Sequence, residues 1–288
     1  MTFLAAAIKA ACALALCVAM TFPVAAAAFK GKRGINLDIW TTWPDESRWS
    51  DPAVLLPFPE WRRTVGPTEL AALGGAGFDF VRIPVDPSPF LSPESASLRD
   101  KLIASVVESA RLVNQAGLKA IVDLHLFPAG GNRAIGMAEV LDDPATFERY
   151  LDLVRRMGLA LSREDVELVA FELMNEPVTD CAEAEDAWSE HLKRLFAAAR
   201  ASAPRLTLVL SGACWSSADG LARLDPGMIP DDNVIWTFHS YDPFLLTHQG
   251  ATWAGDFIRY VTGIPYPPDA RQAETEAALT AVRSRIED

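Results

Sequence analysis

The chain has 288 residues, of which 50% are hydrophobic and 22% are charged. This length and balance are those of a folded protein with a large core, which excludes disorder and coiled coil as descriptions of the whole. The formal net charge of −12, with no cluster of Lys and Arg to relieve it, excludes nucleic acid and anionic membrane as expected partners. A neutral substrate is compatible with this charge.

Residues 1–28 differ in composition from the rest of the chain. Lys9 precedes an apolar, alanine-rich run over 10–20, and small residues follow it. This order predicts a secretory signal peptide that is cleaved near Ala27 or Ala28, which takes the formal charge from −12 to −13. An uncleaved membrane anchor is the alternative, and the small residues and the lack of a second long apolar run disfavour it.

Two of the four cysteines, Cys181 and Cys214, remain after this cleavage. We expect them to form a disulfide in an oxidising compartment, and two small buried thiols are the alternative. The mature protein is therefore expected to be secreted or periplasmic. We further expect a monomer without stable membrane association.

Short apolar runs rich in Val, Ile, Leu and Phe recur along the chain, separated by segments with helical periodicity. Such runs are typical of strands that are buried on both faces of a parallel sheet. The predicted strands are 34–38, 78–85, 119–126, 166–176, 206–211 and 233–241.

The segments between these runs predict helices. Residues 98–116 place apolar side chains on one stripe, and Gly117 ends the helix. Pro144 is suited to the first turn of a second helix, and Pro204 ends a third over 183–203. The stripe of the first helix comprises Leu102, Val106, Ala110 and Val113, and a fourth helix is predicted over 270–286.

Strands and helices that alternate at about 40-residue spacing predict an α/β fold with a parallel sheet. A doubly wound sheet is the alternative, but no Gly-rich loop follows the first strand. Polar residues follow nearly every strand, as at the C-terminal face of a (β/α)8 TIM barrel. We therefore predict a barrel domain over 29–288. Six strands are two fewer than a closed barrel needs, so we expect this domain to be incomplete at its C-terminus.

The most specific string is Phe171-Glu172-Leu173-Met174-Asn175-Glu176-Pro177. An apolar strand ends in an Asn-Glu pair, and Pro177 cannot donate to a sheet ladder. A carboxylic acid at the end of a buried strand is a candidate for general acid/base chemistry, in which such a group gives and takes a proton. A helix-capping turn is the alternative, and the end of a buried strand disfavours it.

This string and three others at successive strand ends resemble glycoside hydrolase family 5, the cellulase family of retaining (β/α)8-barrel enzymes. The resemblance covers about residues 33–255. The other strings are Val81-Arg82-Ile83-Pro84, Val122-Asp123-Leu124-His125 and Trp236-Thr237-Phe238-His239-Ser240-Tyr241.

The resemblance implies a role for each residue that matches the family's motifs. Without it, Arg82 reads as a structural ion-pair partner, His125 as a core histidine, and the last string as a strand cap. The implied roles are general acid/base for Glu176, contact with the sugar 2-hydroxyl for Asn175, support of the nucleophile carboxylate for Arg82, a subsite wall for His125, a hydrogen bond to the nucleophile for Tyr241, and contact with substrate or the acid/base region for His239.

Tryptophan rings stack on the apolar faces of sugars, and several lie in loops expected on the active face. We expect some of them to line sugar subsites, with ordinary packing as the alternative. These residues are Trp40, Trp43, Trp215 and Trp253.

The resemblance predicts a retaining β-glycanase with polysaccharide or oligosaccharide substrates. The expected substrate is a β-1,4-glucan, with mannan or a mixed or exopolysaccharide glucan as alternatives. The family's nucleophile is a Glu after a seventh strand, and we identify no residue of the chain in that role. A non-catalytic glycan-binding protein or an inactive fragment is therefore the rival interpretation.

We expect no cofactor and no metal, since the four His residues are dispersed. The sequence contains no Gly-x-Ser-x-Gly elbow, so it does not support an esterase.

Overall fold

The computed structural model describes residues 28–37, 43–56, 65–126, 137–179, 181 and 187–266. The predicted signal peptide, Trp40 and the helix predicted over 270–286 therefore lie outside the described residues, apart from position 28. The chain divides into two compact units. Unit 1 comprises Met1–Asn175, Ser189–Leu210 and Asp225–Trp236, and unit 2 comprises Glu176–Trp188, Ser211–Leu224 and Thr237–Asp288.

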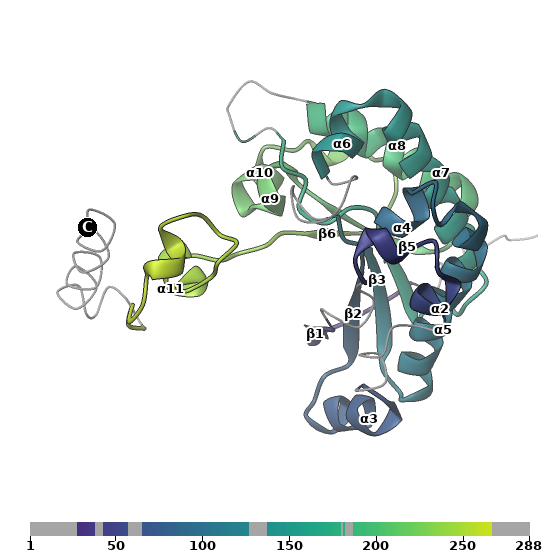
Figure 1. Cartoon of the computed structure of the whole chain (residues 1–288), viewed down its shortest axis with the longest axis horizontal. Helices are drawn as coiled ribbons and strands as arrows, with labels where there is room; N and C mark the ends of the chain where they lie inside the picture. The colour runs from purple at the N-terminus through teal and green to yellow at the C-terminus, as the bar shows by residue number, and fades with distance from the viewer. Residues whose placement is uncertain are drawn as a thin grey trace, which may run out of the picture. The chain divides into compact units, whose positions relative to one another are not determined.

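The sheet contains the six predicted strands in their chain order, β1 to β6 (Figure 1). Each neighbouring pair from β1 to β5 is parallel, as helical crossovers between successive strands require. The prediction of a parallel α/β sheet in sequential order is thus confirmed. The strands are β1 (Gly34–Asn36), β2 (Phe80–Val85), β3 (Lys119–Leu124), β4 (Val169–Glu172), β5 (Thr207–Ser211) and β6 (Val234–Thr237).

Each strand is shorter than the run that predicted it, and β4 shows why. Beyond Glu172 the chain still bonds to both neighbours, because Leu173 N donates to Val209 O at 3.4 Å and Asn175 N donates to Leu124 O at 3.0 Å. The regular ladder has ended, but the extended chain has not. Asn175 is therefore held beside the C-terminal ends of the neighbouring strands β3 and β5.

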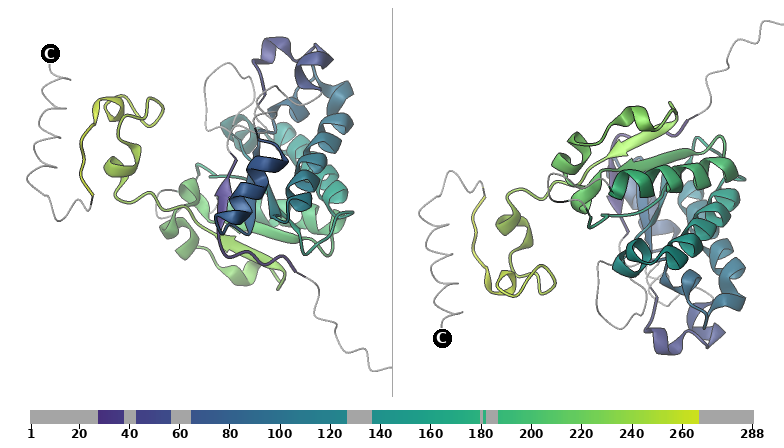
Figure 2. Two further views of the ribbon diagram at one scale, coloured as in Figure 1. Left: turned by 90° about the horizontal axis from the view of Figure 1, so that it is seen from below. Right: turned by 90° about the horizontal axis from the view of Figure 1, so that it is seen from above.

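Three long helices connect the strands and lie along the sheet (Figures 1 and 2). The helices predicted between the second and fifth strands are confirmed as α5 (Arg99–Gln115), α7 (Pro144–Leu161) and α8 (Ala187–Ser202). The apolar stripe predicted for α5 is fully buried. Asp143 caps α7 by accepting from Thr146 N at 2.8 Å, with Pro144 in the first turn as predicted.

Unit 1 also contains short α-helices and 3-10 helices between the strands and the long helices. In chain order they are η1 (Glu46–Arg48), α2 (Pro52–Leu55), α3 (Pro67–Gly75), α4 (Ser88–Leu91), η3 (Ala96–Leu98), α6 (Met137–Asp142) and η4 (Pro226–Met228).

Trp43 belongs to the core of unit 1. Its ring is buried, packs edge-on against Phe90, and donates from Nε1 to Asp86 O at 2.8 Å. For Trp43 the alternative of ordinary packing therefore holds. The polar edge of the indole finds a backbone acceptor inside the protein, which makes its burial favourable.

Unit 2 contains α9 (Ala213–Ser216), α10 (Ala218–Ala222), α11 (Phe244–His248) and η5 (Ile258–Tyr260). Two glycines bring the start of α9 against α10. A Cβ on Gly220 would lie 2.1 Å from Ala213 O, and one on Gly212 would lie 2.2 Å from Leu221 N. Only glycine permits this backbone contact.

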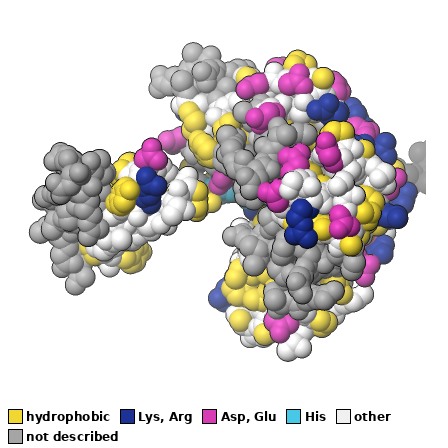
Figure 3. All heavy atoms as spheres, viewed as in Figure 1, with side chains coloured by type: hydrophobic (Ala, Val, Ile, Leu, Met, Phe, Trp, Pro, Cys, Tyr) yellow, Lys and Arg dark blue, Asp and Glu magenta, His cyan; other side chains and the backbone are white. Residues whose placement is uncertain are grey.

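The described surface carries charges of both signs. On the face shown in Figure 3, acidic and basic side chains of unit 1 are interspersed rather than gathered into one patch. Among the described residues, no helix combines the length and the apolar character needed to cross a bilayer.

Candidate active site

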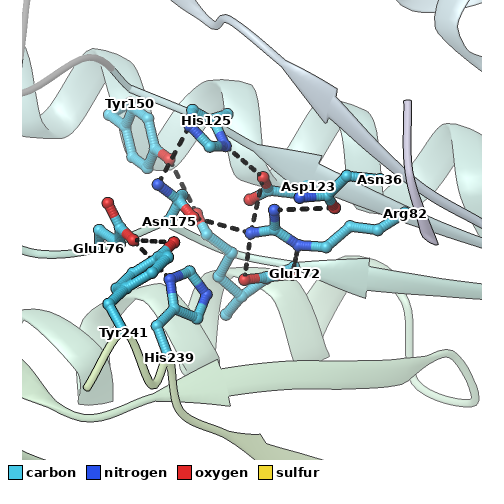
Figure 4. Close-up of polar contacts among 11 residues, drawn as sticks. Asn36, Arg82, Asp123, His125, Tyr150, Glu172, Asn175, Glu176, His239 and Tyr241 are labelled. Carbon is cyan, nitrogen blue, oxygen red and sulfur yellow. Dashed lines mark hydrogen bonds and ion pairs between the residues drawn. The ribbon is translucent and has the colours of Figure 1, made fainter. Parts of the chain in front are cut away.

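Arg82 forms the centre of a polar cluster at the C-terminal ends of β2, β3 and β4 in unit 1 (Figure 4). Its Nε and Nη2 donate to Glu172 Oε2 and Oε1 at 2.7 and 2.8 Å. Nη2 also lies 2.8 Å from Asp123 Oδ2. Both carboxylates are buried, at 2% and 0% exposure. One guanidinium thus compensates two buried negative charges, as the alternative interpretation of Arg82 as a structural ion-pair partner predicted.

Asn175 connects Arg82 to His125. Its Oδ1 accepts from Arg82 Nη2 at 2.8 Å, and its Nδ2 lies 3.2 Å from His125 Nε2. His125 Nδ1 in turn lies 2.9 Å from Asp123 Oδ2. The side chain of His125 is 27% exposed, so this histidine belongs to a polar network at the sheet edge rather than to the apolar core.

Tyr150 supports the segment that leads from β4 to Asn175. Its hydroxyl donates to Leu173 O at 2.8 Å from a fully buried position on α7. Burial raises the pKa of Tyr150 well above its ordinary value, and the charges of Asp123 and Glu172 raise it further. The hydroxyl therefore remains a hydrogen-bond donor across the ordinary pH range.

Glu176 follows Asn175 directly and opens unit 2. Its φ of 43° lies in the left-handed region, which a residue with a Cβ adopts at a cost. Tyr241 Oη donates to Glu176 Oε1 at 3.1 Å, and His239 Nδ1 lies 2.5 Å from the same oxygen (Figure 4). The contact implied between His239 and the acid/base region is present. Tyr241, for which the resemblance implied the nucleophile as partner, bonds to Glu176 in this structure.

A second left-handed segment lies beside the chain that follows Glu176. Cys214, Trp215 and Ser216 have φ values of 50°, 60° and 54°. Cys214 N donates to Thr179 O at 2.9 Å, and Trp215 N donates to Pro177 O at 2.8 Å. These bonds hold Pro177 and Thr179, which follow Glu176, against the left-handed turn that residues 214–216 form.

The same turn carries the Cys181–Cys214 disulfide and supports His239. The structure contains the predicted disulfide, with Cα atoms 4.7 Å apart. His239 N donates to Ser216 O at 2.7 Å, and Ser217 forms a parallel bridge with His239. The segments that carry Glu176 and His239 are therefore tied to one turn of unit 2.

Two of the predicted tryptophans are exposed in unit 2. Trp215 is 44% exposed and Trp253 is 77% exposed, with the Trp253 ring against His248 at a centroid distance of 5.3 Å. Exposed indole faces are available to stack on a ligand. Their role in sugar binding stays a prediction.

Three residues of the cluster were not predicted as site residues: Asp123, Glu172 and Tyr150. The sequence could have indicated Asp123 and Glu172, because a carboxylate within a buried apolar strand requires a partner. Tyr150 lies on an otherwise ordinary amphipathic helix, which gave no such indication. No group of His, Cys, Asp and Glu among the described residues is arranged to hold a metal ion.

The family model for cellulases, glycosyl hydrolase family 5, matches residues 63–285. The chain belongs to glycoside hydrolase family 5. The predicted family is thereby confirmed, and with it the barrel fold of which the six-stranded sheet is part.

Relatives within family 5 are similar over most of the chain. Cellodextrinase A of Ruminococcus flavefaciens is 31% identical over 234 residues, which is 78% of this chain and 63% of that protein. Endoglucanase C of Acetivibrio thermocellus is 26% identical over 200 residues, 69% of this chain and 57% of that protein. The chain thus spans about three fifths of the length of these curated relatives.

A solved family 5 structure shows the same fold. Thermotoga maritima Cel5A, in complex with mannotriose, superposes with a TM-score of 0.62 at 23% identity. The match covers 88% of this chain and 76% of that chain. Its sequence identity is low, so the similarity bears on the fold alone.

Proposed function

We propose that this protein is a retaining glycosidase that hydrolyses β-1,4-glucan, with Glu176 as its general acid/base. The observation that carries the proposal is the carboxyl of Glu176, held by Tyr241 and His239 and joined by a peptide bond to Asn175. The names of the curated relatives, a cellodextrinase and an endoglucanase, support this substrate class.

The hydrogen bonds around Glu176 suggest which oxygen acts as the acid. Tyr241 donates to Oε1, and His239 Nδ1 faces the same atom. We take His239 Nδ1 as the donor of this pair, so that Oε1 accepts two hydrogen bonds and the acidic proton is placed on Oε2. In the first step Oε2–H would protonate the leaving glycosidic oxygen, and in the second the carboxylate would take a proton from water.

A retaining reaction also needs a carboxylate nucleophile. We assign that role to no residue of the printed sequence. Asn175 would contribute a hydrogen bond to the sugar 2-hydroxyl, which strengthens in the transition state. Trp215 and Trp253 would offer stacking surfaces for neighbouring sugars.

The substrate is tested on a panel with the protein expressed from its complete gene. We expect release of reducing ends from carboxymethyl cellulose, less from glucomannan, and a β-anomer as the first product by NMR. Mannan is included because a solved family 5 enzyme was crystallised with mannotriose. Faster hydrolysis of mannan than of cellulose would show that mannan is the preferred substrate and would contradict the proposed β-1,4-glucan. Binding without hydrolysis would favour the glycan-binding alternative.

We also propose that the protein is exported, cleaved near Ala27 or Ala28, and monomeric. The apolar, alanine-rich run of residues 10–20 supports export. The Cys181–Cys214 disulfide supports an oxidising compartment.

Two measurements on the exported protein check its leader and its disulfide. We expect the intact mass to lack the first 27 or 28 residues, and thiol titration of the unfolded, unreduced protein to find no free thiol. Reduction should release two. Two thiols before reduction would contradict the disulfide, and a retained leader would contradict cleavage.

A further inference from the structure

The polar cluster of unit 1 contains a closed ring of four side chains, joined by three hydrogen bonds and by the ion pair between Arg82 and Asp123. Arg82 contacts Asn175 and Asp123 through Nη2, and His125 contacts the same two residues through its two ring nitrogens. Figure 4 shows these contacts as dashed lines. Arg82 comes from β2, Asp123 and His125 come from the end of β3 and the residue after it, and Asn175 comes from the segment after β4. Every donor and acceptor in this ring is determined by chemistry, because an arginine has only donors.

The proton positions follow step by step from Arg82. The atom of Asn175 that faces Arg82 must be the amide oxygen, so the amide nitrogen faces His125 Nε2. That nitrogen is a donor, and Nε2 must therefore be unprotonated to accept from it. Nδ1 then carries the single ring proton and donates to Asp123 Oδ2.

We propose that Asp123 is a positioning residue: it holds His125 as the neutral Nδ1–H tautomer, and His125 thereby holds the amide nitrogen of Asn175 while Arg82 holds the amide oxygen. The role of Asn175 in the reaction rests on the proposed function. The tautomer of His125 rests only on the contacts in the ring. A carboxylate that selects the tautomer of a histidine is known from catalytic triads. Here the histidine would position an amide instead of moving a proton.

The burial of Asp123 supports a positioning role over a stabilising one. Its Oδ2 serves both Arg82 and His125, whereas its Oδ1 is buried and has no hydrogen-bond partner among the described residues. Arg82 already has a bidentate partner in Glu172. A second buried carboxylate with an unsatisfied oxygen adds little to stability, which favours the contact with His125 as the role of Asp123.

Two substitutions at position 123 and one control distinguish the effect of the hydrogen-bond acceptor of Asp123 from the effect of its negative charge. Asp123→Leu replaces both oxygens by methyl groups of similar shape and removes the acceptor. Asp123→Asn removes only the charge, because its amide oxygen can take the place of Oδ2. Glu172→Gln is the matched control, since it also removes one negative charge beside Arg82, at a residue outside the ring of four side chains.

The tautomer is read by two-dimensional 15N NMR of the full-length protein from its complete gene, with 15N-labelled histidine. The chain has four histidines, and a His125→Gln variant assigns the signal. We expect the Nδ1–H form in the wild type, in Asp123→Asn and in Glu172→Gln. Asp123→Leu should shift the signal to the Nε2–H form that free histidine prefers. An Nε2–H or doubly protonated His125 in the wild type at pH 7 would overturn the proposal, even if no variant folds.

Activity provides the second readout. We expect Asp123→Leu to lower kcat/KM roughly ten- to a hundredfold, as loss of an orienting partner does elsewhere, without lowering the melting temperature. The loss should fall mainly on kcat, and Asp123→Asn should recover most of it. A changed tautomer with unchanged kcat/KM would overturn the positioning role. A wild type without hydrolysis would contradict the proposed function and leave the tautomer result intact.

Discussion

Glu176→Gln is expected to lower the hydrolysis of polysaccharide by about 10²–10⁴-fold, the usual contribution of a general acid/base. Gln has the shape of Glu and can still accept from Tyr241 and His239, so the fold should be unchanged. It has no proton to give to a leaving sugar. The glycosidic oxygen of a polysaccharide is a poor leaving group and depends on that proton.

The effect should depend on the leaving group. With a dinitrophenyl cellobioside the leaving group departs without protonation, so the first step should survive the substitution and appear as a burst of dinitrophenol. The steady state should then slow, because the carboxylate that activates water is missing. Glu167→Gln, at an exposed position before β4, serves as the control and should leave both substrates unaffected. Equal loss of the first step on both substrates would argue against the acid role.

Arg82→Met is expected to lower the free energy of unfolding by about 3–5 kcal/mol, the cost of removing one partner from a buried ion pair. Methionine fills much of the same volume but leaves Glu172 and Asp123 buried without their cation. The loss is therefore electrostatic rather than a matter of packing. Chemical denaturation at pH 7, followed by tryptophan fluorescence and circular dichroism, measures it.

The chain offers a matched control for this substitution. Arg156 pairs with Asp152 at 2.7 Å, the same distance as Arg82 to Glu172, but both side chains are nearly half exposed. An exposed pair contributes about 0–1 kcal/mol, so Arg156→Met should have a small effect. Equal effects at both positions would show that burial of the two carboxylates is not what makes Arg82 important. Glu172→Gln in the Arg82→Met background should recover part of the loss.

The sequence by itself determined the order of strands and helices and several of the polar residues that lie near the strand ends. Strand and helix periodicity are local, so runs such as 119–126 and stripes such as that of 98–116 were readable without the fold. The Asn175-Glu176 pair was found for the same reason, because an apolar strand ends there. The end of the fourth strand was placed too far along, since the extended chain after Glu172 leaves the ladder before it changes direction.

The tertiary structure decided which of these residues meet. Arg82 and Glu172 are 90 positions apart, and their pairing depends on the parallel register of β2, β3 and β4. No local pattern shows that Asp123 lies between Arg82 and His125, or that Tyr150 reaches the carbonyl of Leu173. Trp43 and Trp215 both lie in predicted loops, yet one is in the core and the other is exposed. Periodicity reports which face of an element is buried, whereas a contact between elements depends on strand register and helix packing, and these are properties of the folded chain as a whole.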